Sequence, residues 1–288
     1  MAFDHPAVHS GLLPLAVAFV LTGVLRFAFS PARGAQVACA GVGFGFLVGY
    51  LATLGLPAWP LAGALQKLAL IAAAGLVVGL VLDVMRAGVA SVRVLGVLGL
   101  IGALAWVFET QVRQAEPSGL IEPALIAAGG ALVLWRLAGR RDEGVPPAVT
   151  VIVAALGLAG VALVSASLSI AQLAGALAAA IGGFALWSWP VARFPFAAGG
   201  TFAALIPLLA LAAITTLLTK APVWVLAPLI LVFFADLVSN RLPAGSGRWR
   251  EALQPVYLAV IAALPAGLAV GLAVLAAGGG GDADLYYR

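Results

Sequence analysis

The chain has 288 residues, of which 64% are hydrophobic and only 9% are charged, with a formal net charge of +4. A soluble domain of this length carries charge on roughly a quarter of its residues, so this composition excludes a soluble globular protein. In lipid, every backbone amide must be paired internally, which leaves only helices or a closed barrel. The apolar runs are longer and more continuous than barrel strands of about ten alternating residues. The sequence therefore predicts an all-α, polytopic integral membrane protein.

Ten apolar segments approach the roughly 20 residues that a helix needs to cross a bilayer. In chain order they are residues 10–29, 34–55, 63–83, 94–109, 120–136, 148–165, 169–188, 198–218, 222–239 and 255–277. The fourth and fifth are interrupted by Glu109 and by Glu122 and Pro123, and without this pair the count falls to eight. The long run 148–188 is broken only by the Ser-Ala-Ser-Leu-Ser stretch at 165–169, which predicts two helices joined by a tight turn.

The densest run of charge lies near the middle of the chain and divides it into two groups of five spans. The predicted organisation is a five-helix half at 1–136, a linker loop at 137–147, a second half at 148–277 and a flexible tail at 278–288. An odd number of spans per half would invert one half relative to the other, which is a frequent plan of secondary transporters. No residue-level similarity between the halves accompanies this plan.

The basic residues are distributed unevenly between the two sides of the membrane. One set of alternating loops carries Arg26, Arg33, Arg86, Arg93, Arg136, Arg140, Arg141, Arg193, Arg241, Arg248 and Arg250. The other carries Lys67, Arg113, Lys220 and Arg288. Because basic loops stay in the cytoplasm, we expect the central loop to be cytoplasmic and both termini to be periplasmic. The preference for arginine, alanine and glycine suggests a GC-rich bacterial genome and hence a bacterial inner membrane.

Two aspartates are the first candidates for function, because placing an ionisable group at membrane depth is costly. Asp83 and Asp236 lie near the central-loop ends of the third and ninth predicted spans. Each is either a protonatable or cation-binding carboxylate, or the partner of a loop arginine. For Asp83 the arginine would be Arg86, three residues later on the same helical face.

The opposite side carries the two lysines of the chain, Lys67 and Lys220, at the ends of predicted spans. They either extend toward lipid head groups or, with Arg113, attract an anionic head group or solute. The same side offers acidic residues as alternative partners, namely Glu109, Glu116 and Glu122.

Glycines at four-residue spacing predict places where helices approach closely, because packing rather than hydrophobicity drives helix association in lipid. Such a face serves either the bundle itself or a homo-oligomer or other protein partner. The clearest example is formed by Gly41, Gly45 and Gly49, and shorter ones by Gly75 with Gly79 and Gly267 with Gly271.

The sequence offers no recognisable catalytic, cofactor or metal centre. Its two histidines lie at the N-terminal edge, and its single cysteine, Cys39, lies in an apolar run. It contains no HExxH, GxSxG or P-loop motif. No basic patch is interleaved with aromatic residues, so no nucleic-acid partner is expected.

Two functions are left open by these features. One is a secondary transporter of a small solute or lipid-like molecule, in which Asp83, Asp236, Lys67, Lys220 and Glu109 are the candidate transport or gating residues. The other is a non-catalytic membrane subunit or scaffold of a larger complex or homo-oligomer. An enzyme is the third reading and the least favoured, because no nucleophile, base and acid converge in the sequence.

Overall fold

The computed structural model describes residues 8–61, 63–114, 117–190, 193–219, 221–241 and 248–278. These residues are helical with short connections, and no strand occurs among them. The first half contains η1 (Val8–Leu12), α1 (Leu13–Ala28), α2 (Pro31–Val37), α3 (Ala40–Leu54), α4 (Ala64–Val84), α5 (Val89–Val107), α6 (Glu109–Gln114) and α7 (Pro117–Ala138). The second contains α8 (Val145–Val164), α9 (Leu168–Trp187), α10 (Ala197–Leu218), η2 (Val223–Leu226), α11 (Ala227–Val232), α12 (Ala235–Ser239) and α13 (Arg248–Gly278).

Nine helices in the described part of the chain are long and apolar enough to cross a membrane. They include the fourth and fifth predicted spans, which the structure forms as α5 and α7. The prediction of an all-α polytopic membrane protein is confirmed. The turn predicted at residues 165–169 is also present, between the end of α8 at Val164 and the start of α9 at Leu168.

The ninth predicted span, 222–239, differs from the prediction because it is not one continuous helix. Residues Val223–Ser239 form an apolar stretch shorter than the other nine. This stretch consists of the 3-10 turn η2, the short helix α11 and the single turn α12. The sequence predicts one membrane-spanning helix here, and the structure has three short helical elements in succession.

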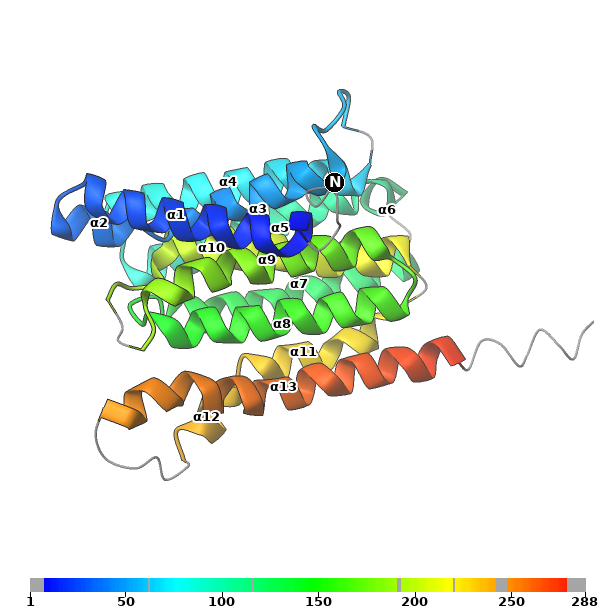
Figure 1. The fold of residues 1–288 in the computed structure, drawn as a ribbon. Helices are drawn as coiled ribbons and strands as arrows, with labels where there is room; N and C mark the ends of the chain where they lie inside the picture. Colours follow the sequence, from blue (N-terminus) through cyan, green and yellow to red (C-terminus); the bar gives the residue numbers. More distant parts are fainter. Residues whose placement is uncertain are drawn as a thin grey trace, which may run out of the picture.

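Helix α10 lies at the centre of the bundle, with almost all of its residues buried. It packs along α4 and also contacts α5, α7 and α9. On one side α1, α3 and α9 pack together, and α8 joins α9 to α13. Figure 1 shows α11, α12 and α13 along the opposite outer side of the bundle. Helices from the two halves of the sequence are therefore interleaved.

The glycine face of α3 is buried within the chain. Cβ atoms added to Gly45 and Gly49 would lie 2.7 Å from the Ala18 Cβ and 2.6 Å from Pro14 Cγ of α1, and Gly41 faces the Thr22 hydroxyl of the same helix. On its far side the face meets α9, where Ala176 lies 3.0 Å from the Gly49 Cβ position. The glycines therefore allow α1, α3 and α9 to approach closely, and a partner chain would have to use another surface.

Candidate functional site

The stretch 223–239 departs from helical geometry at Phe233 and Phe234, between α11 and α12. The Leu237 amide donates to the Phe234 carbonyl at 3.0 Å, a three-residue rather than a four-residue step. The Phe233 carbonyl therefore lies at a break in the helix, where its oxygen is open to a side-chain donor. Breaks of this kind at membrane depth are tolerated where the freed backbone groups find partners inside the protein.

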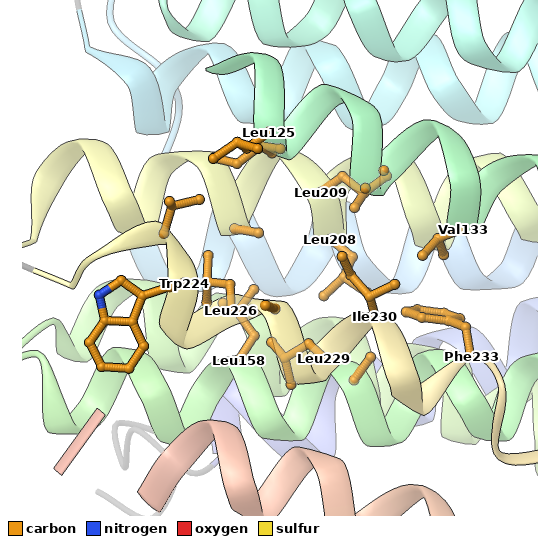
Figure 2. A pocket seen from close by; sticks show the side chains of 17 residues that line it. Leu125, Val133, Leu158, Leu208, Leu209, Trp224, Leu226, Leu229, Ile230 and Phe233 are labelled. Atoms are coloured by element: carbon orange, nitrogen blue, oxygen red, sulfur yellow. The ribbon is translucent and has the colours of Figure 1, made fainter. Parts of the chain in front are cut away.

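A cavity of about 330 Å³ lies beside this broken segment, between η2–α11 and helices α7, α8 and α10. Its lining residues are all apolar or glycine. Figure 2 shows Trp224 toward one end of the cavity and Phe233 toward the other. Small residues on the surrounding helices, such as Gly129 and Ala212, leave the space open.

Close packing between α7 and α11 borders this cavity. A Cβ added to Gly129 would lie 2.8 Å from the Ile230 Cδ1 atom, so this glycine sets the distance between the two elements. A Cβ added to Gly130 would meet Leu209 of α10 at 3.0 Å. Glycines of α7 therefore allow it to pack closely against both α11 and α10 at the edge of the cavity.

A group of four charged side chains lies at the Phe233 end of the broken segment, and we call it the Asp236 cluster: Arg136, Arg140, Glu143 and Asp236. The Arg136 Nη2 atom donates to both carboxylate oxygens of Asp236 at 2.8 Å. The Arg140 Nη1 atom lies 2.9 Å from Asp236 Oδ2. Arg140 also bonds Glu143, through Nε at 2.9 Å and Nη2 at 2.6 Å. Two positive and two negative side chains compensate one another here.

Arg136 connects the Asp236 cluster to the break in the helix. Its Nε atom donates to the Phe233 carbonyl at 2.8 Å, and its guanidinium lies 4.5 Å from the centre of the Phe234 ring. Phe233 in turn lines the cavity. One arginine from α7 therefore contacts the ionic cluster, the freed carbonyl and an aromatic ring of the broken segment.

The Arg140 guanidinium of the Asp236 cluster keeps its positive charge. Burial lowers the pKa of Arg140, but hydrogen bonds from its guanidinium to Glu143, together with the charges of Glu143 and Asp236, raise that pKa above its usual value. The Arg140 guanidinium consequently stays protonated.

Asp83, the other buried aspartate, is bound mainly by backbone amides, and the Cys39 thiol donates to its Oδ2 atom at 4.0 Å. Its Oδ1 accepts the Ala198 amide at 2.9 Å and its Oδ2 accepts the Gly199 amide at 2.6 Å. The amides of Phe196 and Ala197 donate to carbonyls of the central loop, at Glu143 and Arg141. The first amides of a helix have no partners within the helix. At the start of α10 these amides find their acceptors outside the helix, in the carboxylate of Asp83 and in two carbonyls of the central loop.

The start of α10 comes close to α4 because both helices carry glycines there. A Cβ added to Gly79 would lie 2.8 Å from the Ala198 carbonyl oxygen and from the Gly199 Cα atom. A Cβ on Gly199 would lie 3.0 Å from the Asp83 carboxylate. Only small residues on both helices let the aspartate reach the amides, so its partner is α10 rather than Arg86.

Lys67 and Glu109 meet at the opposite end of the bundle. The Lys67 Nζ atom donates to Glu109 Oε2 at 2.9 Å and to the Trp106 carbonyl at 2.8 Å. Arg113 donates to the other Glu109 oxygen at 2.6 Å. The hydrogen bond from Lys67, followed by that from Arg113, lowers the pKa of Glu109 below its usual value. Of the partners predicted for Lys67, the structure selects the acidic one.

The structure thus separates the candidates into groups. Asp83 and Asp236 lie at the central-loop end with different partners, whereas Lys67 and Glu109 form one ion pair at the other end. Lys220 lies outside the described residues. In the part of the chain that the structure describes, no three histidine, cysteine or acidic side chains are grouped as metal ligands.

In the sequence, Arg136 and Arg140 indicate only the orientation of the chain in the membrane. Their spacing of four residues, which places two cations on one helical face, was the available signal that they share a partner. The cavity had no such signal, because its lining residues are ordinary membrane-helix residues. The sequence matches no protein-family model and no curated protein at a significant level.

Proposed function

We propose that this protein is a membrane transporter of a lipid-like molecule, whose apolar part occupies the cavity between α7, α8, α10 and α11. The observation that carries the proposal is the position of this cavity beside a broken membrane segment. Discontinuous helices near the substrate are a recurring feature of secondary transporters, because a break lets one part of the helix move relative to the rest.

The size and lining of the cavity favour an apolar ligand. A volume of about 330 Å³ is at the lower end of the range for small-molecule pockets, about 300–1,000 Å³. Burying an ionised or hydrogen-bonding group among apolar side chains without a partner is costly. A single acyl or isoprenoid chain therefore suits this space better than a polar solute does.

The Asp236 cluster supplies a gate for this cavity. Movement of α11 and α12 away from α7 requires the bond from Arg136 to the Phe233 carbonyl and the ion pairs of Asp236 to break. Asp83 has the opposite role, since it fixes the start of α10 to α4 as the static side. Lys67 and Glu109 close the far end of the bundle, and the arginine-rich end faces the cytoplasm of a bacterial cell.

A lipid-translocation assay tests the proposal. Proteoliposomes receive a single-chain lysophospholipid labelled with nitrobenzoxadiazole, and dithionite removes fluorescence only from label in the outer leaflet. With the wild-type protein we expect the protected inner pool to shrink faster than in protein-free liposomes. If both decay equally, the proposed transport is wrong.

Two alanine substitutions connect this activity to the cavity. Ala212→Phe places a ring in the cavity and is expected to reduce the translocation rate about tenfold or more. Ala128→Phe on α7 adds the same ring at an exposed position outside the cavity lining and is expected to leave the rate unchanged. Equal rates in the two variants would remove the cavity from the mechanism.

A membrane subunit or scaffold is the second candidate, and the outer face of α13 favours it. Cβ atoms added to Gly267 and Gly271 would meet no atom within 4 Å, so these glycines are open, unlike those of α3. Leu264 and Leu275 beside them are 72% and 71% exposed. Such a face suits a helix of a second polypeptide.

Size analysis in mild detergent separates the two candidates. A scaffold is expected to elute as a fixed complex that Gly267→Leu with Gly271→Leu dissociates. A transporter is expected to elute as a monomer whose size this pair of changes leaves unaltered.

A further inference from the structure

The outer surface of α5 and α7 carries a second hollow, separate from the cavity described above. It is a groove of about 420 Å³ lined by Val94, Val97, Leu98, Ala131, Leu132 and Trp135. About half of the surface of Val94, Leu98, Leu132 and Trp135 remains exposed in the bundle. A furrow of this composition on a membrane-spanning surface is in contact with lipid chains.

Arg93 lies at one end of this groove and is held there by its neighbours. Its Nε atom donates to the Trp135 carbonyl at 3.1 Å, and its guanidinium lies 4.8 Å from the centre of the Trp135 ring. A Cβ added to Gly139 would lie 2.7 Å from the Arg93 Nη2 atom, so the glycine leaves room for the guanidinium. The cation is thus preorganised beside the apolar furrow.

The charge of Arg93 contrasts with that of the arginines in the Asp236 cluster. Arg136 and Arg140 are paired with carboxylates. No ion pair links Arg93 to a carboxylate within the residues that the structure describes. A guanidinium has five N–H groups, and the bond to Trp135 uses one of them. The remaining donors suit an anionic oxygen ligand such as phosphate.

Counted from the first residue of its span, Val89–Val107, Arg93 lies at the depth of a lipid head group. It lies four residues after the start of α5 at Val89, which corresponds to about 6 Å along a helix axis. The head-group layer on each side of a bilayer has a similar thickness, about 5–7 Å. Trp135, at the same end of the groove, is a residue type enriched in this layer. The groove itself then extends from the head-group layer into the hydrocarbon.

We propose that this groove binds an anionic phospholipid, with its phosphate on the Arg93 guanidinium and one acyl chain between α5 and α7. Arg93 and the apolar groove both favour an anionic lipid. A free anion would bind the guanidinium without filling the groove, and a neutral lipid would fill the groove without pairing with the guanidinium. Basic pockets between transmembrane helices are a known means of recognising anionic head groups. This lipid would bind independently of any molecule in the cavity beside α11.

The proposal is tested by the lipids that the purified full-length protein retains. The protein is reconstituted in nanodiscs of equal parts phosphatidylglycerol and phosphatidylcholine, released, and weighed with its bound lipids by native mass spectrometry. We expect the wild-type protein to enrich phosphatidylglycerol about fivefold, the effect of one arginine near the membrane surface. No enrichment in the wild-type protein would overturn the proposal.

Two charge variants and two groove variants locate the binding. Arg93→Gln is expected to abolish the enrichment, whereas Arg33→Gln, which removes an exposed arginine of α2, is expected to preserve it. Ala131→Trp fills the furrow and is expected to reduce retained phosphatidylglycerol severalfold, whereas Ala16→Trp, at an exposed position of α1 away from the groove, is not. Equal effects of the two arginine variants, or of the two alanine variants, contradict the proposal.

Folding and the source of the anion are controlled separately. The melting temperature of each variant is compared in phosphatidylcholine alone, where the proposed lipid is missing. Should Arg93→Gln fail to fold, Ala131→Trp decides the question, because it leaves the guanidinium in place. Excess inorganic phosphate is expected not to displace the bound lipid, and displacement would identify a free-anion site instead.

Discussion

The two buried aspartates at the central-loop end are equally shielded and have different partners. Asp83 and Asp236 are 7% and 6% exposed. Asp83 accepts two backbone amides at the start of α10, whereas Asp236 is paired with two arginines from the end of α7 and the loop. Burial alone therefore does not reveal what a membrane carboxylate does. Asp83 connects α4 to the backbone at the start of α10, whereas Asp236 connects α12 to charged side chains of α7 and the central loop.

The largest effect is expected when Asp83 is replaced by leucine. The Ala198 and Gly199 amides then lose their acceptors in a buried place, and each unpaired donor costs about 1–3 kcal/mol. We expect the free energy of unfolding in mixed micelles to fall by about 3 kcal/mol. Asp83→Asn retains one acceptor oxygen and should lose about half as much. A leucine variant as stable as the wild-type protein would contradict this assignment of Asp83.

Next in size is the effect of Gly79→Val, which tests the close approach on which the Asp83 contact depends. The new side chain would meet the backbone of α10 at Ala198 and Gly199, and overpacking of this kind costs about 1–3 kcal/mol. The matched control is Gly102→Val on α5, where an added Cβ meets no atom within 4 Å. Both variants carry the same helix-propensity change, so their difference in melting temperature isolates the contact between α4 and α10.

A smaller effect is expected for Asp236→Asn. Breaking a fully buried ion pair costs about 3–5 kcal/mol, but here the arginine side chains are 22% and 17% exposed and Glu143 remains beside Arg140. Solvent screening reduces the expected loss to about 1–2 kcal/mol.

The ion-pair character of this site appears in a double-mutant cycle. Combining Asp236→Asn with Arg136→Gln should cost less than the sum of the two single changes, because neither charge is then left alone. Additive losses would show that the pair contributes no coupling energy. For Asp83 the two amide partners belong to the backbone and cannot be removed by a second substitution in this way.

The smallest effect concerns Glu109, whose carboxylate is partly exposed. Its pKa is lowered by hydrogen bonds from Lys67 and then from Arg113, so the folded protein binds its proton less readily than the unfolded chain does. The stabilisation is therefore complete above the ordinary glutamate pKa of about 4.3, and it is lost as pH falls through the folded value. The wild-type protein should melt slightly above Glu109→Gln at neutral pH. This difference should shrink between about pH 5 and pH 3, and a difference that grows with acidification would refute the assignment.

How far the sequence predicts this protein depends on the element. Helices α8 and α9 and the turn between them follow from the apolar run and from the serines that interrupt it. The break at Phe233 and Phe234 does not follow, because both residues fit an apolar span as well as a break. The cavity beside α11 does not follow from the sequence either, since Gly129 and Ala212 on separate helices leave space only when those helices meet.

The sequence by itself determined that this protein lies in a lipid bilayer and that it is helical. Both depend on composition within single segments, because lipid requires each span to satisfy its own backbone. Only the tertiary structure decided the partners of the buried charges. Asp83 and Ala198 are 115 residues apart, and Arg136 and Asp236 are 100 apart. Contacts over such separations arise from the way helices pack, and glycines such as Gly79 and Gly199 permit the close approach of α4 and α10 that the Asp83 contact needs.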